Sequence, residues 1–274
     1  MRIRVKFTKT GCMKFIGHLD VMRYFQKAIR RADLPVAYSE GFSPHMLMSF
    51  ASPLGVGKTS MGEYFDLDIA EGASISPDEA AAKLQSQMAD GISVVGAVEV
   101  SMKKADKCMS QVAAADYSVS FRPGKLNLPL DTGKLTAAFL DQPSIEIMRK
   151  TKTSQKVTDI RPWIYSFACE NSRIEETQQN LNGMNFTEKR PCEKILHGEK
   201  AILNGNGRDA CSFIFTMKLA SGSVHNLKPE LVMEAFAVFA GFTIPDYALM
   251  IQREEIYGEC PDGYLIPLDG FALK

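Results

Sequence analysis

The chain has 274 residues, 45% of them hydrophobic and 23% charged, and its 32 basic side chains are balanced by 32 acidic ones. This composition is typical of a globular protein long enough for two ordinary domains. Because no run of about 18 apolar residues occurs, a membrane-spanning helix is excluded.

The N-terminal residues 1–7 alternate charged and apolar side chains and lack the apolar core of a signal peptide, so we expect a cytoplasmic protein. The six cysteines are far apart and form no C-x-x-C pair, which favours reduced thiols. Cys192 and His197 are close enough in sequence to contribute to a metal site, but without a second close pair we predict no metal site and no cofactor.

Hydrophobic periodicity predicts an alternating order of elements in the first hundred residues. These are a strand at 2–8, a helix at 19–32, an extended segment at 45–52, a strand at 64–69, a helix opening at 76 and a strand at 92–100. The second helix has a complete start signal, with Ser76 as N-cap, Pro77 at the first position and Glu79 closing a capping box. We expect Gly91 to end it.

A polar linker is expected at 103–112, after which the same order recurs. The predicted elements are a strand at 117–121, a helix at 131–142, a strand at 144–150, an extended segment at 160–169, a strand at 212–219, a helix at 229–241 and a strand at 247–257. The order βαββαβ is ferredoxin-like. We therefore predict an α+β protein of two tandem ferredoxin-like domains with antiparallel sheets, at 1–102 and 113–258. Residues 171–208 are interpreted as a surface insertion, and the apolar tail at 259–274 is expected to pack on the protein or on a partner.

The first predicted helix has a basic face. At 100° per residue its apolar residues fall on one side, and four cations cluster on the other: Arg23, Lys27, Arg30 and Arg31. No acidic residue lies four positions away to neutralise them. The stripe is either a solvated face or a phosphate-binding surface.

Two histidines flank this helix region. His18 and His45 are candidates for acid/base chemistry, although neither has a Ser or Cys nucleophile nearby. Between them, Tyr38 and Glu40 belong to a turn around Gly41 that could present the ring of Phe42 to a partner; alternatively, Phe42 belongs to the core.

The segment at 55–59, Gly-Val-Gly-Lys-Thr, is similar to a phosphate-binding loop but lacks the required first glycine and is followed by a strand, so we reject nucleotide binding. The small-residue loop at 221–229 leads into a helix N-terminus. With Asn226 and Lys228 it is either an anion site or an ordinary strand-to-helix turn.

A charged segment leads to the only tryptophan. Asp159 and Arg161 lie on one face of a predicted strand, where a local ion pair is the simplest interpretation. Trp163 follows, and it is either a core residue or a platform on which a nucleobase stacks.

Several short motifs carry a family resemblance. They are Phe15-Ile16-Gly17-His18-Leu19-Asp20, Ala28-Ile29-Arg30-Arg31-Ala32, Leu34-Pro35, Tyr38-Ser39-Glu40-Gly41-Phe42, Pro44-His45 and Glu63-Tyr64, with weaker matches at 159–162 and 226–229. With these residues the chain resembles the bacterial radical-SAM-associated protein family, a domain of unknown function. The three-cysteine motif that binds the iron–sulfur cluster of a radical-SAM enzyme is itself missing.

The resemblance implies a protein encoded beside, or fused to, a radical-SAM protein and connected with RNA metabolism. Our leading hypothesis is a non-enzymatic RNA-binding or substrate-presenting module that works with a radical-SAM partner. The alternatives are a metal-independent endoribonuclease or transferase using His18 or His45, and a protein–protein scaffold for a radical-SAM enzyme.

Overall fold

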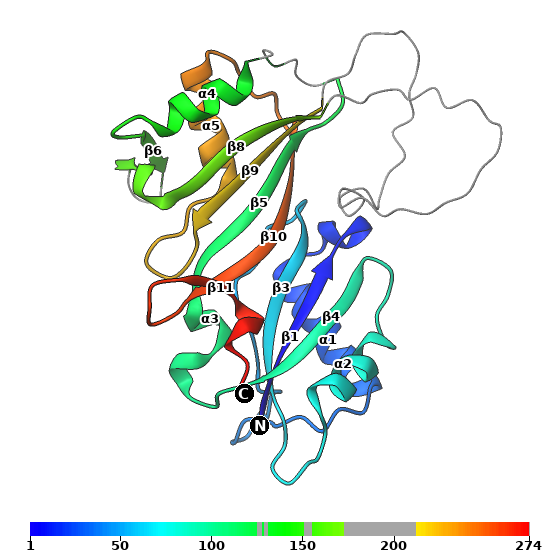
Figure 1. Cartoon of the computed structure of the whole chain (residues 1–274). Coiled ribbons are helices and arrows are strands. Elements are labelled where there is room, and N and C mark those ends of the chain that lie inside the picture. The colour runs from blue at the N-terminus through cyan, green and yellow to red at the C-terminus, as the bar shows by residue number, and fades with distance from the viewer. Residues whose placement is uncertain (125–127, 129–130, 151–154, 173–211, 274) are drawn as a thin grey trace, which may run out of the picture.

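A computed structural model describes residues 1–124, 128, 131–150, 155–172 and 212–273 of the chain (Figure 1). The N-terminal half contains β1 (Arg2–Lys9), η1 (Gly11–Phe15), α1 (His18–Arg31), β2 (Met48–Phe50), β3 (Thr59–Asp68), α2 (Pro77–Gln85) and β4 (Ile92–Val100). A connector of η2 (Lys104–Asp106) and α3 (Cys108–Gln111) follows. The C-terminal half contains β5 (Val112–Phe121), α4 (Thr132–Leu140), β6 (Glu146–Lys150), β7 (Gln155–Asp159), η3 (Arg161–Trp163), β8 (Ile164–Ser172), β9 (Ser212–Ala220), α5 (Pro229–Ala240), β10 (Leu249–Glu259), β11 (Leu265–Pro267) and η4 (Leu268–Phe271).

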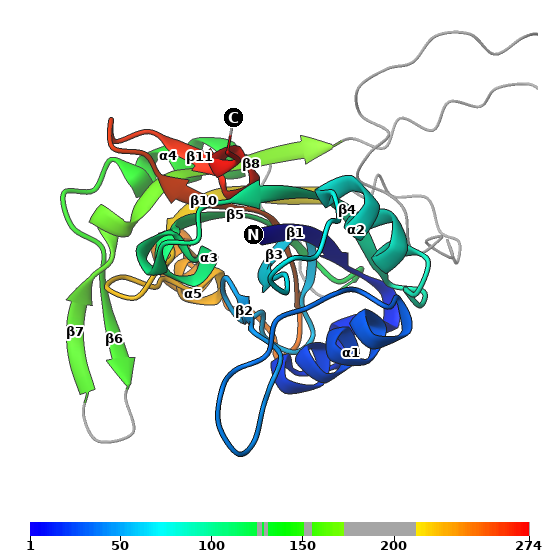
Figure 2. The same ribbon diagram turned by 90° about the horizontal axis from the view of Figure 1, so that it is seen from below.

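The fold is mixed α/β and is built on one mostly antiparallel sheet. The described strands of this sheet run in the order β4-β1-β3-β10-β5-β9-β8, with β2 added to β3 and β11 added to β10. Only the junction of β3 with β10 is parallel among the described pairs. Helices α1 and α5 lie on the same side of the sheet (Figure 2).

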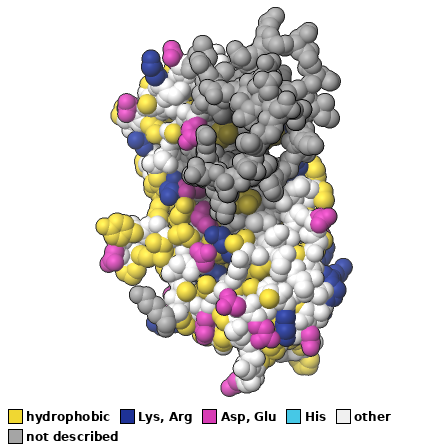
Figure 3. Space-filling model, turned by 45° about the vertical axis from the view of Figure 1, so that its right-hand side comes forward, with side chains coloured by type: hydrophobic (Ala, Val, Ile, Leu, Met, Phe, Trp, Pro, Cys, Tyr) yellow, Lys and Arg dark blue, Asp and Glu magenta, His cyan; other side chains and the backbone are white. Residues whose placement is uncertain are grey.

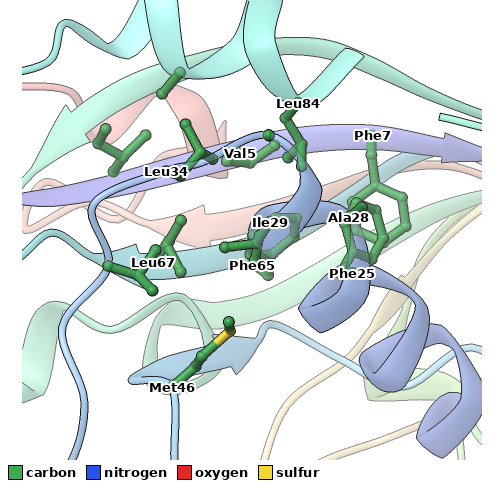
Figure 4. Packing of buried hydrophobic residues seen from close by; sticks show 14 of the residues in the cluster. Val5, Phe7, Phe25, Ala28, Ile29, Leu34, Met46, Phe65, Leu67 and Leu84 are labelled. Carbon is green, nitrogen blue, oxygen red and sulfur yellow. The ribbon is translucent and has the colours of Figure 1, made fainter. Parts of the chain in front are cut away.

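The N-terminal core lies between α1 and the sheet. Phe25, Ala28 and Ile29 of α1 are fully buried, and Phe25 packs on Phe7 of β1 and Phe65 of β3 with ring centroids 4.7 and 4.8 Å apart (Figure 4). The helix forms here because its apolar residues recur at a spacing of three and four. This packing turns the opposite face of α1 to solvent.

The C-terminal core is aromatic. Phe236 of α5 is in contact with Phe139 of α4, Phe167 of β8 and Phe215 of β9 at centroid distances between 5.2 and 5.6 Å. All four rings are buried. The helices α4 and α5 are thereby fixed to the sheet.

The two halves share the sheet through a short seam. Thr59 and Ser60 of β3 pair in parallel with Gln252 and Arg253 of β10. Close approach is possible because Gly62 has no side chain, since a Cβ there would lie 2.7 Å from the backbone oxygen of Glu254.

Several sequence predictions are corrected. Helix α2 begins as expected, with Ser76 Oγ accepting a 3.1 Å bond from the backbone N–H of Glu79, but it ends at Gln85 rather than near Gly91. Gly91 instead adopts a positive φ in the turn before β4, with its oxygen accepting from the N–H of Thr10.

The predicted linker at 103–112 does connect the two halves, but it is folded. It forms η2 and α3, because Cys108 is fully buried and its backbone N–H donates to Asp66 of β3. The predicted strand at 144–150 exists as β6, but β6 and β7 form a separate hairpin outside the main sheet. The expected insertion at 171–208 lies outside the described residues apart from its first two, which end β8, and Cys192 and His197 lie outside them too. The tail packs back through β11 and the buried Leu268.

Candidate nucleic-acid interface

The solvent face of α1 displays the four predicted cations. Arg23, Lys27, Arg30 and Arg31 are all exposed. Arg23 forms a 3.5 Å ion pair with Asp20. Asp20 lies three positions earlier, whereas the sequence pattern considered only acidic residues four positions away. Arg31 donates to the side chain and backbone oxygen of Gln87 after α2. In the part of the chain that the structure describes, the side chains of Lys27 and Arg30 have no hydrogen-bond or ion-pair partner.

A short finger at 38–46 projects from the same half of the molecule (Figure 2). Tyr38 and Met46 pair as an isolated bridge at its base, and Ser39 and His45 bond to each other through both backbone and side chain. Gly41 supplies the positive φ of the tip. Phe42, next to it, is fully exposed, so it is not a core residue.

The two candidate histidines lie in different surroundings. The ring of His18, at the start of α1, packs edge-on against Phe50 at 5.3 Å. The Nδ1 atom of His45 lies 2.8 Å from Ser39 Oγ, within the finger. His18 thus contacts an aromatic side chain beside α1, and His45 helps to hold the finger together; an acid/base role for either stays a prediction. Glu40, at the finger's tip, is exposed.

Asp159 and Arg161 hold backbone groups in place. Asp159 Oδ1 accepts from the backbone N–H groups of Arg161 and Ile145, at 2.9 and 2.8 Å, and these bonds lower the pKa of Asp159. The guanidinium of Arg161 donates to the backbone oxygen of Leu140 at 2.7 Å, at the last residue of α4. The ion pair predicted from the spacing is therefore replaced by a staple that joins β6, β7 and α4.

Next to this staple, side chains from three segments gather around Trp163. The ring of His225, in the loop between β9 and α5, stacks on Trp163 with centroids 4.8 Å apart and planes 27° apart. The guanidinium carbon of Arg149 in β6 lies 5.6 Å from the centroid of the Trp163 ring. The sequence suggested Trp163 alone; the partners at 149 and 225 carry no motif that could have identified them.

The loop at 221–228 packs back on the sheet before it enters α5. The backbone N–H of Ser221 donates to Ala113, and that of Leu227 donates to Ala220. Asn226 is exposed, and its backbone oxygen accepts a 3.4 Å bond from Arg149. Lys228 is the N-cap residue of α5, with its side chain exposed and no side-chain cap bond. The structure thus places Asn226 beside the Trp163 cluster.

Sequence reasoning missed a buried set of charges at the seam between the halves. Arg253 donates to Glu63 at 2.8 Å, and its residue is 2% exposed. Burial lowers the pKa of Arg253, but Glu63 and Tyr117 outweigh burial and raise it. Burial also lowers the pKa of Lys9, which donates to the backbone oxygen of Ile16 at 2.9 Å.

A second buried pair lies on the opposite face of the sheet. Arg4 of β1 forms a bidentate pair with Asp66 of β3, at 2.8 and 3.1 Å, and also donates to backbone oxygens of Asp106 and Leu268. The sequence carried a signal for this pair, because Arg2 and Arg4 alternate with apolar residues in β1, and Asp66 and Asp68 do so in β3.

The face of the molecule in Figure 3 displays acidic and basic side chains interspersed.

The loop at 55–58 contributes to a pocket of about 380 Å³ at the seam. Lys58 pairs with Glu230 of α5 at 2.6 Å, and the N–H of Gly57 donates to the oxygen of Lys14. Strand β3, not a helix, follows. The loop's lysine therefore joins the two halves, whereas its second glycine ties the loop to η1 within the N-terminal half.

No helix among the described residues is long and apolar enough to cross a membrane. The same residues contain no group of three or more histidine, cysteine, aspartate or glutamate side chains able to hold a metal ion.

The fold and this surface define a mixed α/β protein with a mostly antiparallel sheet and an exposed cationic helix. Residues 2–195 match the family DUF2344, described as "Uncharacterized protein conserved in bacteria", and the chain belongs to that family. Its description names no radical-SAM protein, so that association stays a prediction.

A search of curated proteins gave no match. Among solved structures, the chain is similar to one in "Crystal Structure of a Cbf5-Nop10-Gar1 Complex", with 9% sequence identity and a TM-score of 0.43. The similarity covers 93% of this chain and 48% of that one, so this chain spans about half the length of its match.

Proposed function

We propose that the protein is a non-enzymatic RNA-binding module that presents RNA to a radical-SAM partner in RNA modification or metabolism. One observation carries the RNA-binding part: the solvent face of α1 concentrates Arg23, Lys27, Arg30 and Arg31 on a chain whose formal net charge is zero. A local cationic face on a neutral protein is the electrostatic footprint expected of phosphate contacts.

Lys27 and Arg30 are the central pair of this face. They lie three positions apart, and residues at this spacing are neighbours on a helix surface. Because neither side chain has an internal partner among the described residues, a polyanion can engage both without breaking a bond of the fold. Each phosphate neutralised releases condensed counterions, which makes the affinity depend on salt.

The proposal includes a fold, a partner and a location. We infer two tandem ferredoxin-like units, because the strand order β4-β1-β3-β2 in one half is repeated as β10-β5-β9-β8 in the other. The resemblance of residues 15–66 supports the radical-SAM partner and a cytoplasmic location, and the exposed Phe42 suits contact with that partner. Co-purification with the radical-SAM protein from RNase-treated extract tests this part; loss of the pair after RNase would contradict direct contact.

The α1 surface is tested by removing its two unpartnered charges. We expect Lys27→Gln/Arg30→Gln to weaken binding of a fluorescein-labelled single-stranded RNA of mixed sequence. The slope of log affinity against log salt should become shallower by about 1.4, since single strands contribute roughly 0.7 per phosphate contact. Fluorescence anisotropy over a series of KCl concentrations measures both quantities.

A matched control removes two exposed lysines from the connector, Lys103→Gln/Lys104→Gln. This variant has the same change in net charge and should keep the wild-type slope. Equal slopes for the two double variants would show that α1 has no special role, and salt-independent binding of the wild type would exclude phosphate contacts altogether.

A further inference from the structure

The Trp163 cluster has the parts of a base-stacking site. Three segments that are separate in the sequence contribute to it: β6 with Arg149, η3 with Trp163, and the β9–α5 loop with His225. Folding brings them together. The hairpin of β6 and the β9–α5 loop project from the same side of the C-terminal half (Figures 1 and 2). An aromatic ring, a planar cation and a second planar ring therefore meet at one place on the surface.

The tryptophan is a fixed platform. Its backbone N–H donates to the oxygen of Ile160 at 3.0 Å, and the ring packs against the aromatic core while staying half-buried. The preceding Arg161 is anchored to the end of α4 through Leu140. A rigid, partly exposed indole supplies stacking area with little loss of conformational entropy.

His225, by contrast, is an exposed residue in a loop. Its ring lies parallel to the indole within 27°, the offset-stacked arrangement that a nucleobase takes on an aromatic side chain. The neighbouring Val224 is 83% exposed, so the loop at this point has solvent around it. The imidazole thus covers part of the indole surface on which a base would stack.

Arg149 places a positive charge next to the indole of Trp163. Its guanidinium lies against the indole and makes one long bond, 3.4 Å, to the backbone oxygen of Asn226. The contact of a cation with an aromatic ring is a recurring part of single-strand binding surfaces, where it complements base stacking.

We propose that Trp163 is a nucleobase-stacking platform for single-stranded RNA, that His225 covers it in the unbound protein, and that Arg149 contacts the adjoining phosphate. This inference rests on the proposed RNA-binding function and adds a second contact surface, which is distant in sequence from α1. The stack recognises any base, so it confers affinity for single strands rather than for a sequence.

Trp163 is the only tryptophan of the chain, so its fluorescence reports on this site alone. We expect single-stranded oligo(U) to quench that emission as it binds. Heparin, a polyanion without bases, should displace RNA from the protein without the same quenching. His225→Ala should bind oligo(U) at least as tightly as the wild type, because the competing ring is gone, and should still be quenched.

Trp163→Leu should weaken oligo(U) binding by roughly tenfold, or about 1.4 kcal/mol. Fluorescence anisotropy measures this change, since the variant has no tryptophan emission. His18→Ala is the matched control for His225→Ala, because it also removes a histidine ring packed on an aromatic residue, at a position far from Trp163 in the sequence. This control should leave the quenching unchanged. Circular dichroism would establish that each variant is folded.

The outcomes separate this inference from the proposed function. Binding seen by anisotropy with unchanged tryptophan emission would overturn the stacking site and leave the α1 surface standing. Quenching that survives Lys27→Gln/Arg30→Gln with unaltered affinity would support the stacking site and overturn the role of α1. Absence of any RNA binding would overturn both.

Discussion

Two ion pairs that involve the N-terminal half differ in their exposure to solvent: one is buried and the other is on the surface. Glu63 and Arg253, at the seam between the halves, are 7% and 2% exposed in their side chains. Asp20 and Arg23, on α1, are 63% and 68% exposed. A buried charge without its partner costs several kcal/mol, whereas an exposed pair contributes little. The seam charges therefore matter for stability, and the α1 charges lie where an external ligand can reach them.

Breaking the seam should have the largest effect on stability. Glu63→Leu leaves the buried Arg253 guanidinium with Ser52 and Tyr117 but without its carboxylate. We expect the free energy of unfolding to fall by about 3–5 kcal/mol, the usual cost of orphaning one member of a buried pair. Urea denaturation followed by circular dichroism measures this change.

The compensating variant distinguishes a lost ion pair from general damage to the seam. Glu63→Leu/Arg253→Met removes both charges and fills similar volume, so it should recover most of the lost stability. If Glu63→Leu alone is less than about 1 kcal/mol below wild type, the buried pair does not hold the two halves together.

An intermediate effect should appear at alkaline pH and originate at Cys108. Burial first, and then the nearby Asp66 carboxylate, raise the pKa of this thiol to about 12 from its ordinary value near 9. The neutral thiol is favoured in the folded state, so its contribution to stability is complete below pH 9 and is lost as the pH rises towards 12. At pH 10.5 the loss is about 2 kcal/mol.

Cys108→Ala should remove this part of the pH dependence while lowering stability at neutral pH, where the Sγ bond to Ser49 is also lost. Comparing urea denaturation at pH 8.5 and 10.5 for both proteins gives the difference. The deeply buried Tyr64, whose pKa burial also raises, adds a shared decrease above pH 10 that cancels in the comparison. A pH dependence identical in the two proteins would exclude Cys108 as its source.

What could be predicted from the sequence depends on whether the signal is local or comes from contacts between segments that are distant in the chain. Helix α1, strand β1 and the Ser76 N-cap were predictable because their signals are local: a spacing of three and four, an alternation of two, and a capping serine. The connector at 103–112 was predicted as a linker, since polar composition alone gives no sign that Cys108 would be buried.

The candidate site divides in the same way. The cations of α1 could be predicted as one face, because a single helix places them together. The partners of Trp163 could not, because Arg149 and His225 reach it only after β6, η3 and the β9–α5 loop are folded side by side. The pair of Glu63 with Arg253 joins residues 190 positions apart, and no local pattern carries that contact.

The smallest effect on stability, and the sharpest test of the comparison, is expected at Asp20. Asp20→Asn breaks an exposed pair and weakens a favourable first-turn carboxylate, so unfolding should change by no more than about 1 kcal/mol. RNA binding should nevertheless improve, because Arg23 is released and one negative charge leaves the cationic face. The salt slope should steepen by about 0.7 for the one additional phosphate contact.

Glu79→Gln is the matched control for Asp20→Asn. Glu79 is a similarly exposed acid in the first turn of α2, and it pairs with Lys83 at 3.3 Å. The two variants make the same change in net charge and similar changes in helix stability, so only their position relative to the α1 face differs. Equal RNA affinities for the two would mean that the cations of α1 act through net charge alone, and weaker binding by Asp20→Asn would reverse the assignment of α1 as the phosphate-contacting surface.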